Sequence, residues 1–133
     1  MDIYAQNILD RYKQPFYRER KIDADIEGAE ANHSCGDRVS VRLETADNKI
    51  KDYSFNGAGC AVSMAAADMI GDLIEGMNTE EILKLRKEDI YEILGIEISV
   101  RRSKCALLTL MAIQNAILEN QGRGKKSWPD YHI

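Results

Sequence analysis

Apolar side chains near the N-terminus recur with the period of a helix. Tyr4, Ile8 and Tyr12 are each four residues apart, and Pro15, which cannot continue a helix, follows them. The pattern predicts a short amphipathic helix that ends at this proline. A charged connector separates the helix from a weak edge-strand candidate at residues 24–29.

The next segment has the alternating pattern of a β-hairpin. Residues 38–44 place Val39, Val41 and Leu43 on one face and polar residues on the other, which predicts a half-buried strand. A turn at residues 46–48 leads to a return strand at residues 50–55. In that strand Tyr53 and Phe55 share one face and Ile50 falls on the other, so either a β-bulge separates them or Ile50 covers the opposite side.

Beyond the hairpin, the apolar period changes from that of a strand to that of a helix. The change occurs at Gly57-Ala58-Gly59-Cys60. Helices are predicted from Ala61 to a glycine cap at Gly76, from residue 78 or 79 to 85, over residues 88–94, and from near Ser103 onwards. This order of elements predicts an α+β fold, with helices packed on one face of a small antiparallel sheet.

Size and composition are those of a single soluble domain. The chain has 133 residues, of which 44% are hydrophobic and 30% charged, and a net charge of −4 argues against general nucleic-acid binding. No apolar run is long enough for a membrane span, and the first residues have no signal-peptide pattern. Three cysteines cannot all pair within one chain, so reduced thiols in a cytoplasmic protein are expected.

The chain divides into a predicted domain, residues 1–121, and a basic C-terminal tail, residues 122–133. The tail breaks the helical pattern and contains the only tryptophan, Trp128. A flexible terminus is the expectation for such a segment. The alternative is a docking segment for a partner, with Trp128 and Tyr131 as anchors.

All three cysteines lie at predicted element boundaries. Cys35 precedes a strand, Cys60 lies at the strand-to-helix junction, and Cys105 is in the first turn of the last helix. A helix N-terminus lowers the pKa of a nearby thiol, so lowered pKa values are expected for Cys60 and Cys105. For Cys60, the alternative is a buried, unreactive thiol after a tight turn.

A carboxylate is placed to join these thiols. Asp37 follows Cys35 by two residues, and such residues point to the same side of an extended segment. Three sulfurs and one oxygen suit tetrahedral zinc, or iron in a cluster with one weak ligand. Zinc-ribbon proteins have paired C-x-x-C motifs, and this spacing is different. A weaker, exchangeable ligand is what a carrier of metal cargo requires.

Three motifs contain these residues: Asn32-x-x-Cys35-Gly36-Asp37, Gly57-x-Gly59-Cys60-Ala61-x-Ser63-x-Ala65 and Lys104-Cys105-Ala106. Together they resemble the IscU/SufU family of iron–sulfur cluster assembly proteins, also called the NifU N-terminal-like family. The resemblance implies a three-stranded antiparallel sheet packed by helices. It also implies that Cys35, Cys60 and Cys105 bind a cluster or zinc, with Asp37 as a conditional fourth ligand. A pyridoxal-phosphate cysteine desulfurase would deliver persulfide sulfur, with Cys35 as the acceptor and Cys105 as the alternative.

The chain departs from the family pattern at several positions. His33 replaces the usual proline after the asparagine, and is either a supporting group or alternative ligand near the site, or an exposed turn residue. Lys104 replaces the histidine that precedes the third cysteine in IscU-type proteins. The Leu-Pro-Pro-Val-Lys run is also missing, which weakens the case for docking of the Hsp70-type chaperone. Lys104 and Arg102 resemble SufU, although the SufU insertion between the second and third cysteines is absent. Their positive charge favours a Cys105 thiolate, unless they form only a solvated loop.

Two functions follow from the resemblance. The first is a scaffold that builds a [2Fe-2S] cluster on the three cysteines and passes it to apo-proteins. It would be a carrier rather than an enzyme, and a monomer or a cluster-linked dimer. The second is a zinc-bound, SufU-type sulfurtransferase that accepts sulfur by ligand exchange. A structural zinc adaptor is a third and simpler possibility. Neither nucleic acid nor a membrane is an expected partner.

Overall fold

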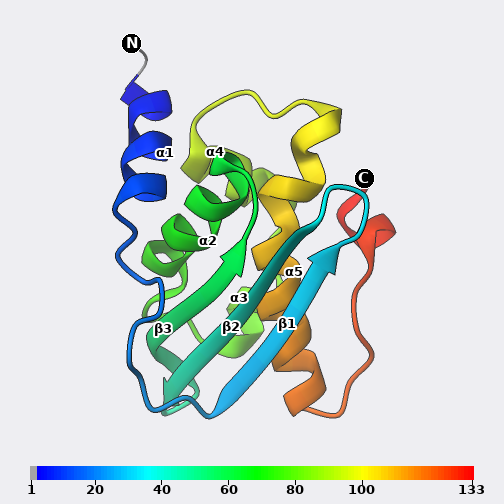
Figure 1. Cartoon of the computed structure of the whole chain (residues 1–133). Helices are drawn as coiled ribbons and strands as arrows, with labels where there is room; N and C mark the ends of the chain where they lie inside the picture. The colour runs from blue at the N-terminus through cyan, green and yellow to red at the C-terminus, as the bar shows by residue number, and fades with distance from the viewer. Residues whose placement is uncertain (1–2) are drawn as a thin grey trace.

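Three antiparallel strands form one sheet in the order β1-β2-β3, with the helices behind it in Figure 1. The strands are β1 (Ile26–Asn32), β2 (Asp37–Ala46) and β3 (Lys49–Ala58). The computed structural model describes residues 3–133. The predicted α+β class, with a small three-stranded antiparallel sheet and helices on one face, is confirmed.

The central strand β2 has the alternation that the sequence predicts. Val39, Val41 and Leu43 are buried, and the residues between them are exposed. The register between β2 and β3 shifts where Glu44 pairs with Asp52 and the next residue pairs with Ile50. Of the two alternatives for Ile50, the β-bulge is therefore correct, and it places Ile50 in the same core as Tyr53 and Phe55.

In the described part of the chain, five α-helices lie on the inner side of the sheet. They are α1 (Ile3–Lys13), α2 (Ala61–Ile74), α3 (Thr79–Leu83), α4 (Lys87–Leu94) and α5 (Ser103–Asn120), with short 3-10 turns at Val100–Arg102 and Trp128–Tyr131. The longest, α5, is buried from Cys105 to Leu118 and packs behind β1 and β2. Within residues 3–133, no helix combines the length and apolar character needed to cross a bilayer.

Local signals in the sequence explain where the short helices begin and end. Asn78 caps α3 through a reciprocal pair with Glu81: its side chain accepts the Glu81 N–H at 2.8 Å, and its own N–H is bound by the Glu81 carboxylate at 3.2 Å. Gly95 ends α4 with φ 69°, a conformation that costs glycine little.

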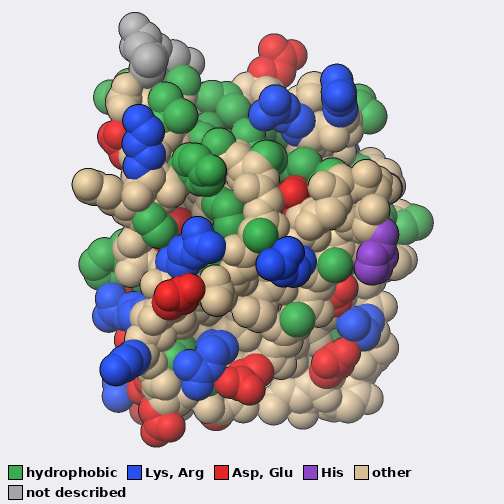
Figure 2. All heavy atoms as spheres, in the orientation of Figure 1, with side chains coloured by type: hydrophobic (Ala, Val, Ile, Leu, Met, Phe, Trp, Pro, Cys, Tyr) green, Lys and Arg blue, Asp and Glu red, His purple; other side chains and the backbone are tan. Residues whose placement is uncertain are grey.

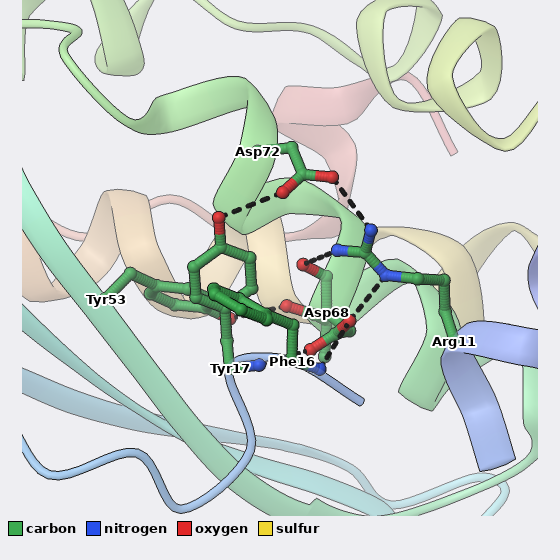
Figure 3. A network of polar contacts seen from close by, with 7 residues as sticks. Arg11, Phe16, Tyr17, Tyr53, Asp68 and Asp72 are labelled. Atoms are coloured by element: carbon green, nitrogen blue, oxygen red, sulfur yellow. Dashed lines mark hydrogen bonds and ion pairs between the residues drawn. The ribbon is translucent and has the colours of Figure 1, made fainter. Parts of the chain in front are cut away.

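A buried carboxylate fixes α1 and the segment after it against α2 (Figure 3). Asp68 is 0% exposed and accepts the backbone N–H groups of Phe16 at 3.1 Å and Tyr17 at 2.7 Å. Arg11 pairs with Asp68 and with Asp72, and the Tyr17 hydroxyl donates to Asp72 at 2.9 Å. Asp68 thus supplies the acceptors that the chain between α1 and β1 needs in order to pack.

The C-terminal segment has contacts that a free tail would lack. Tyr131 is 3% exposed, and its hydroxyl donates to the Gln114 side chain on α5. The Lys126 ammonium donates to the Leu83 carbonyl at 3.0 Å, and Trp128 packs against the core. A domain boundary at residue 121 and a flexible segment beyond it stay predictions.

Candidate metal centre

The turn between β1 and β2 presents the first thiol. Asn32, buried at the end of β1, accepts the N–H of Ser34 on its side-chain oxygen at 3.2 Å, and its carbonyl accepts those of Cys35 and Gly36. Gly36 has φ +78°, which few other residues adopt at low cost. The Asn32 amide also donates to the Cys35 sulfur at 3.0 Å. Cys35 is therefore exposed at the tip of the turn, with its sulfur held by a hydrogen bond.

The second thiol is the N-cap of α2. Cys60 has extended backbone angles, and its sulfur accepts the N–H of Ser63 at 3.5 Å. An acceptor at this position binds one of the free N–H groups of the first helical turn. Cys60 is exposed, so the alternative of a buried thiol is wrong.

The third thiol and the carboxylate complete the group. Cys105, in the first turn of α5, is 9% exposed, and Asp37, at the start of β2, is 4% exposed. The ligand atoms of Cys35, Asp37 and Cys105 all lie within 4.8 Å of one another. Cys60 lines the same hollow as the other two cysteines. Residues far apart in the sequence therefore meet at one end of the sheet.

The hollow over the thiols has a volume of about 940 Å³ and a basic wall. Four cationic side chains line it: Lys87, Arg101, Arg102 and Lys104. Within residues 3–133, no aspartate or glutamate lines this hollow, although the whole chain has a net charge of −4. The mouth of the site is therefore suited to anionic sulfur species and to acidic partners.

The pKa of Cys105 does not follow the expectation for a helix N-terminus. Burial raises this pKa well above the ordinary value for a thiol. A hydrogen bond to the Asp37 carboxylate and the nearby Cys60 and Cys35 raise it further. The predicted lowering is therefore wrong for Cys105 without a metal, because burial and neighbouring anionic groups outweigh the helix dipole. A bound cation reverses this balance by replacing the thiol proton.

Of the three supporting residues proposed from the sequence, two lie near the thiols and one does not. Arg102 and Lys104 both line the thiol hollow, and the Lys104 ammonium lies 5.8 Å from the centre of the Trp128 ring. His33 is exposed and lines a separate hollow of about 490 Å³ with Ala31 and Arg38. The structure therefore brings Arg102 and Lys104 to the thiols and places His33 elsewhere.

The donor set fits zinc or cluster iron. Sulfur ligands of a tetrahedral zinc are about 3.8 Å apart, given a Zn–S distance of about 2.3 Å. The ligand atoms of Cys35, Asp37 and Cys105 lie within 4.8 Å of one another, whereas Cys60 is not part of that group and is exposed at the start of α2. Zinc-type and cluster-type sites both use thiolates, and the oxygen of Asp37 is the weakest of the four donors.

One residue at the site was not singled out by the sequence analysis. Ser63, which appears there only as part of a motif, bonds to the Asp37 carboxylate and to the Cys105 carbonyl. The available signal was its position three residues after Cys60, where a side chain at a helix start faces back toward the cap.

Comparison with known proteins identifies the family. Residues 3–127 match the sequence profile of the NifU-like N terminal domain family. The chain belongs to the NifU-like N-terminal domain family. The resemblance drawn from the three cysteine motifs is thus confirmed.

Relatives of this NifU-like chain include both types considered above. It is 29% identical to the iron–sulfur cluster assembly scaffold protein IscU 1 of Archaeoglobus fulgidus, over 88% of this chain and 76% of the relative. It is 28% identical to the zinc-dependent sulfurtransferase SufU of Bacillus subtilis, over 90% and 92% of the two chains. A crystal structure of FiSufU from Fervidobacterium islandicum AW-1 shares the fold, with a TM-score of 0.72 and 24% identity over 84% of this chain and 94% of that one.

In the metal-free NifU-like chain, we expect iodoacetamide to label Cys35 and Cys60 before Cys105. The first two thiols are exposed, and Cys105 is buried with a raised pKa that keeps it protonated. Mass spectrometry of peptides after timed labelling at pH 8 measures the order. Labelling in denaturant is the control, because there the three rates should become similar. Equal rates in the folded protein would contradict the geometry.

Proposed function

We propose that this protein is an iron–sulfur cluster assembly scaffold. It receives persulfide sulfur from a cysteine desulfurase, and with ferrous iron and an external electron donor that reduces this sulfur to sulfide it builds a [2Fe-2S] cluster on Cys35, Cys60 and Cys105. It then passes the cluster to apo-proteins. The cluster is cargo, and the protein is a carrier rather than an enzyme. The observation that supports this proposal is the convergence of three thiols at one open hollow, with the buried Asp37 carboxylate within 4.8 Å of the Cys35 and Cys105 sulfurs.

Cys35 is the proposed acceptor of sulfur, because it is exposed at the tip of its turn. Its thiolate attacks the outer sulfur of the desulfurase persulfide. A new S–S bond forms on Cys35, the S–S bond of the donor breaks, and the desulfurase cysteine leaves as a thiolate. The proton of the persulfide travels with the transferred sulfur, and the exchange needs no oxidant or reductant. Cys105, at 9% exposure, is the less accessible alternative.

The basic wall of the hollow supports this assignment of partners. Lys87, Arg101 and Arg102 line the same hollow as the thiols, where they stabilise the negative charge of the thiolate that leaves the desulfurase. The recipient of the cluster must approach the same opening. The protein therefore meets the desulfurase and the apo-protein in turn rather than together.

The second candidate is a zinc-bound sulfurtransferase of the SufU type. It is favoured by the close grouping of Cys35, Asp37 and Cys105, which suits a single ion, and by Lys104 and Arg102 on the wall. Bound zinc would keep the thiols deprotonated. In this function Cys35, Asp37 and Cys105 would hold the ion, and Cys35, as the exposed thiol, would exchange off the ion to accept the sulfur.

Metal analysis and a visible spectrum distinguish the two candidates. The protein is purified anaerobically and measured before and after incubation with a cysteine desulfurase, cysteine and ferrous iron. A brown product with acid-labile sulfide is the expected result and supports the scaffold. One zinc per chain, no cluster, and faster turnover of the desulfurase support the sulfurtransferase. A protein with no bound metal and no effect on the desulfurase would contradict both.

We expect Asp37→Ala to lengthen the life of a bound cluster, although the same change should speed the release of a single zinc ion, which loses one of its four ligands. The carboxylate bonds to the Cys105 thiol and stabilises its protonated form, which is the form that leaves the metal. The decay of visible absorbance under air measures the lifetime, with Asp23→Ala, an exposed aspartate away from the hollow, as the control. A shorter lifetime would count against Asp37 as the exchangeable ligand.

A further inference from the structure

Ser63 contacts three of the candidate ligands. It lies in α2, three residues after Cys60, and is 2% exposed. Its backbone N–H donates to the Cys60 sulfur at 3.5 Å, its hydroxyl oxygen is 2.9 Å from the Asp37 carboxylate, and the same oxygen is 3.2 Å from the Cys105 carbonyl. One side chain thus joins the starts of α2, β2 and α5.

The hydroxyl has one proton and two acceptors within reach. The Asp37 carboxylate is the nearer acceptor and carries charge, so it takes the proton in preference to the Cys105 carbonyl. The bond uses Oδ2 of Asp37 and leaves Oδ1 for another partner. The orientation of the carboxylate therefore depends on a donor from a different element.

Gly59 confines Asp37 from a second direction. A Cβ atom at Gly59 would lie 2.8 Å from Oδ1 of Asp37 and 3.1 Å from the Ser63 Cβ. Such distances are too short for a side chain to be added without displacing the carboxylate. Asp37 is therefore held between a close backbone and a hydroxyl, rather than by its own strand alone.

We propose that Ser63 is a positioning residue that aims the Asp37 carboxylate at the metal site, and so sets how strongly this fourth ligand holds an ion. The inference deepens the proposed function and rests on metal binding by Cys35, Cys60 and Cys105. Partners that orient a metal ligand commonly change metal affinity by about 10- to 100-fold when they are removed. Without the hydroxyl, Asp37 loses its orientation and ligates less well.

The test measures zinc release in a double-mutant cycle. The zinc-loaded protein is mixed with a chromophoric chelator, and release rates are compared for wild type, Ser63→Ala, Asp37→Ala and the double variant. We expect Ser63→Ala to speed release about tenfold in the wild-type background and to add nothing in the Asp37→Ala background. Ser40→Ala, an exposed serine on the outer face of the sheet, is the control and should leave the rate unchanged.

A role in stability alone would give a different result. It would lower the melting temperature of Ser63→Ala while leaving zinc release unchanged, or change release equally in both backgrounds, and either result overturns the proposal. Cobalt(II) absorption adds a direct readout, because loss of the oxygen ligand should shift the Ser63→Ala spectrum toward that of Asp37→Ala. An unshifted spectrum would also overturn the proposal.

A matched pair keeps the test decisive if Ser63→Ala does not fold. Ser63→Thr and Ser63→Val have nearly the same size, and only the first has a hydroxyl. Slow zinc release with threonine and fast release with valine support the proposal, and equal rates refute it. None of these measurements needs a desulfurase or a cluster. A wild-type protein that binds no zinc or cobalt would instead count against the proposed function itself.

Discussion

Replacing Cys60 with serine will abolish retention of a cluster and of zinc through purification. A serine hydroxyl does not ionise near neutral pH, so the proposed site loses one of its three thiolates and keeps two sulfurs and the oxygen of Asp37. Anaerobic reconstitution, followed by assays for iron, labile sulfide and zinc per chain, measures the loss. We expect metal content near zero, compared with about one equivalent of zinc for the wild type.

The position of Cys60 makes this result interpretable. The side chain is exposed at the start of α2, and serine is itself a good N-cap residue, so the fold should survive. Circular dichroism of the metal-free variant checks this point, and Ser40→Ala, an exposed serine outside the hollow, is the control for metal binding. Normal metal content in Cys60→Ser would remove Cys60 from the site.

Replacing Asp68 with alanine will have the largest effect on stability. The substitution leaves Arg11 without its buried partner and leaves the backbone N–H groups of Phe16 and Tyr17 without an acceptor. Breaking a buried charged pair by removing one partner costs about 3–5 kcal/mol. Urea unfolding of the metal-free protein measures the change, because a bound metal would add its own binding free energy to the result.

Asp72→Ala is the matched control. Asp72 contacts the same arginine and the Tyr17 hydroxyl, but its side chain is 58% exposed. Exposed ion pairs contribute about 0–1 kcal/mol, so the loss of free energy of unfolding should be much smaller. Equal losses for the two variants would show that the backbone acceptor role of Asp68 has been overestimated.

Periodicity alone predicted most of the fold. The position of the first strand was predicted less well, and the reason is physical. Strand β1 was expected at residues 24–29 and lies at Ile26–Asn32. Its inward positions include Gly28, where a Cβ would lie 2.7 Å from the Ala116 side chain on α5. Helix α5 approaches the strand so closely that a residue larger than glycine does not fit at this position. The strand therefore lacks the large apolar side chains from which its position could be predicted.

The sequence likewise predicted one part of the candidate site and missed another. The positions of Cys35, Cys60 and Cys105 at element boundaries, together with the family motifs, predicted which residues meet, and the structure places them at one hollow. The pKa of Cys105 could not be predicted, because it depends on burial and on anionic groups from other elements. The role of Ser63 likewise depends on a distance across three elements.

The candidate ligands come from separate segments of the chain, and this has a consequence for the newly synthesised polypeptide. Asp37 opens β2, Cys60 precedes α2 and Cys105 begins the long C-terminal helix, so no stretch of the nascent polypeptide has the complete set. In the proposed function, a chain whose last helix has not docked would lack Cys105 at the site and would hold iron or zinc less strongly. Metal loading would then favour the finished protein.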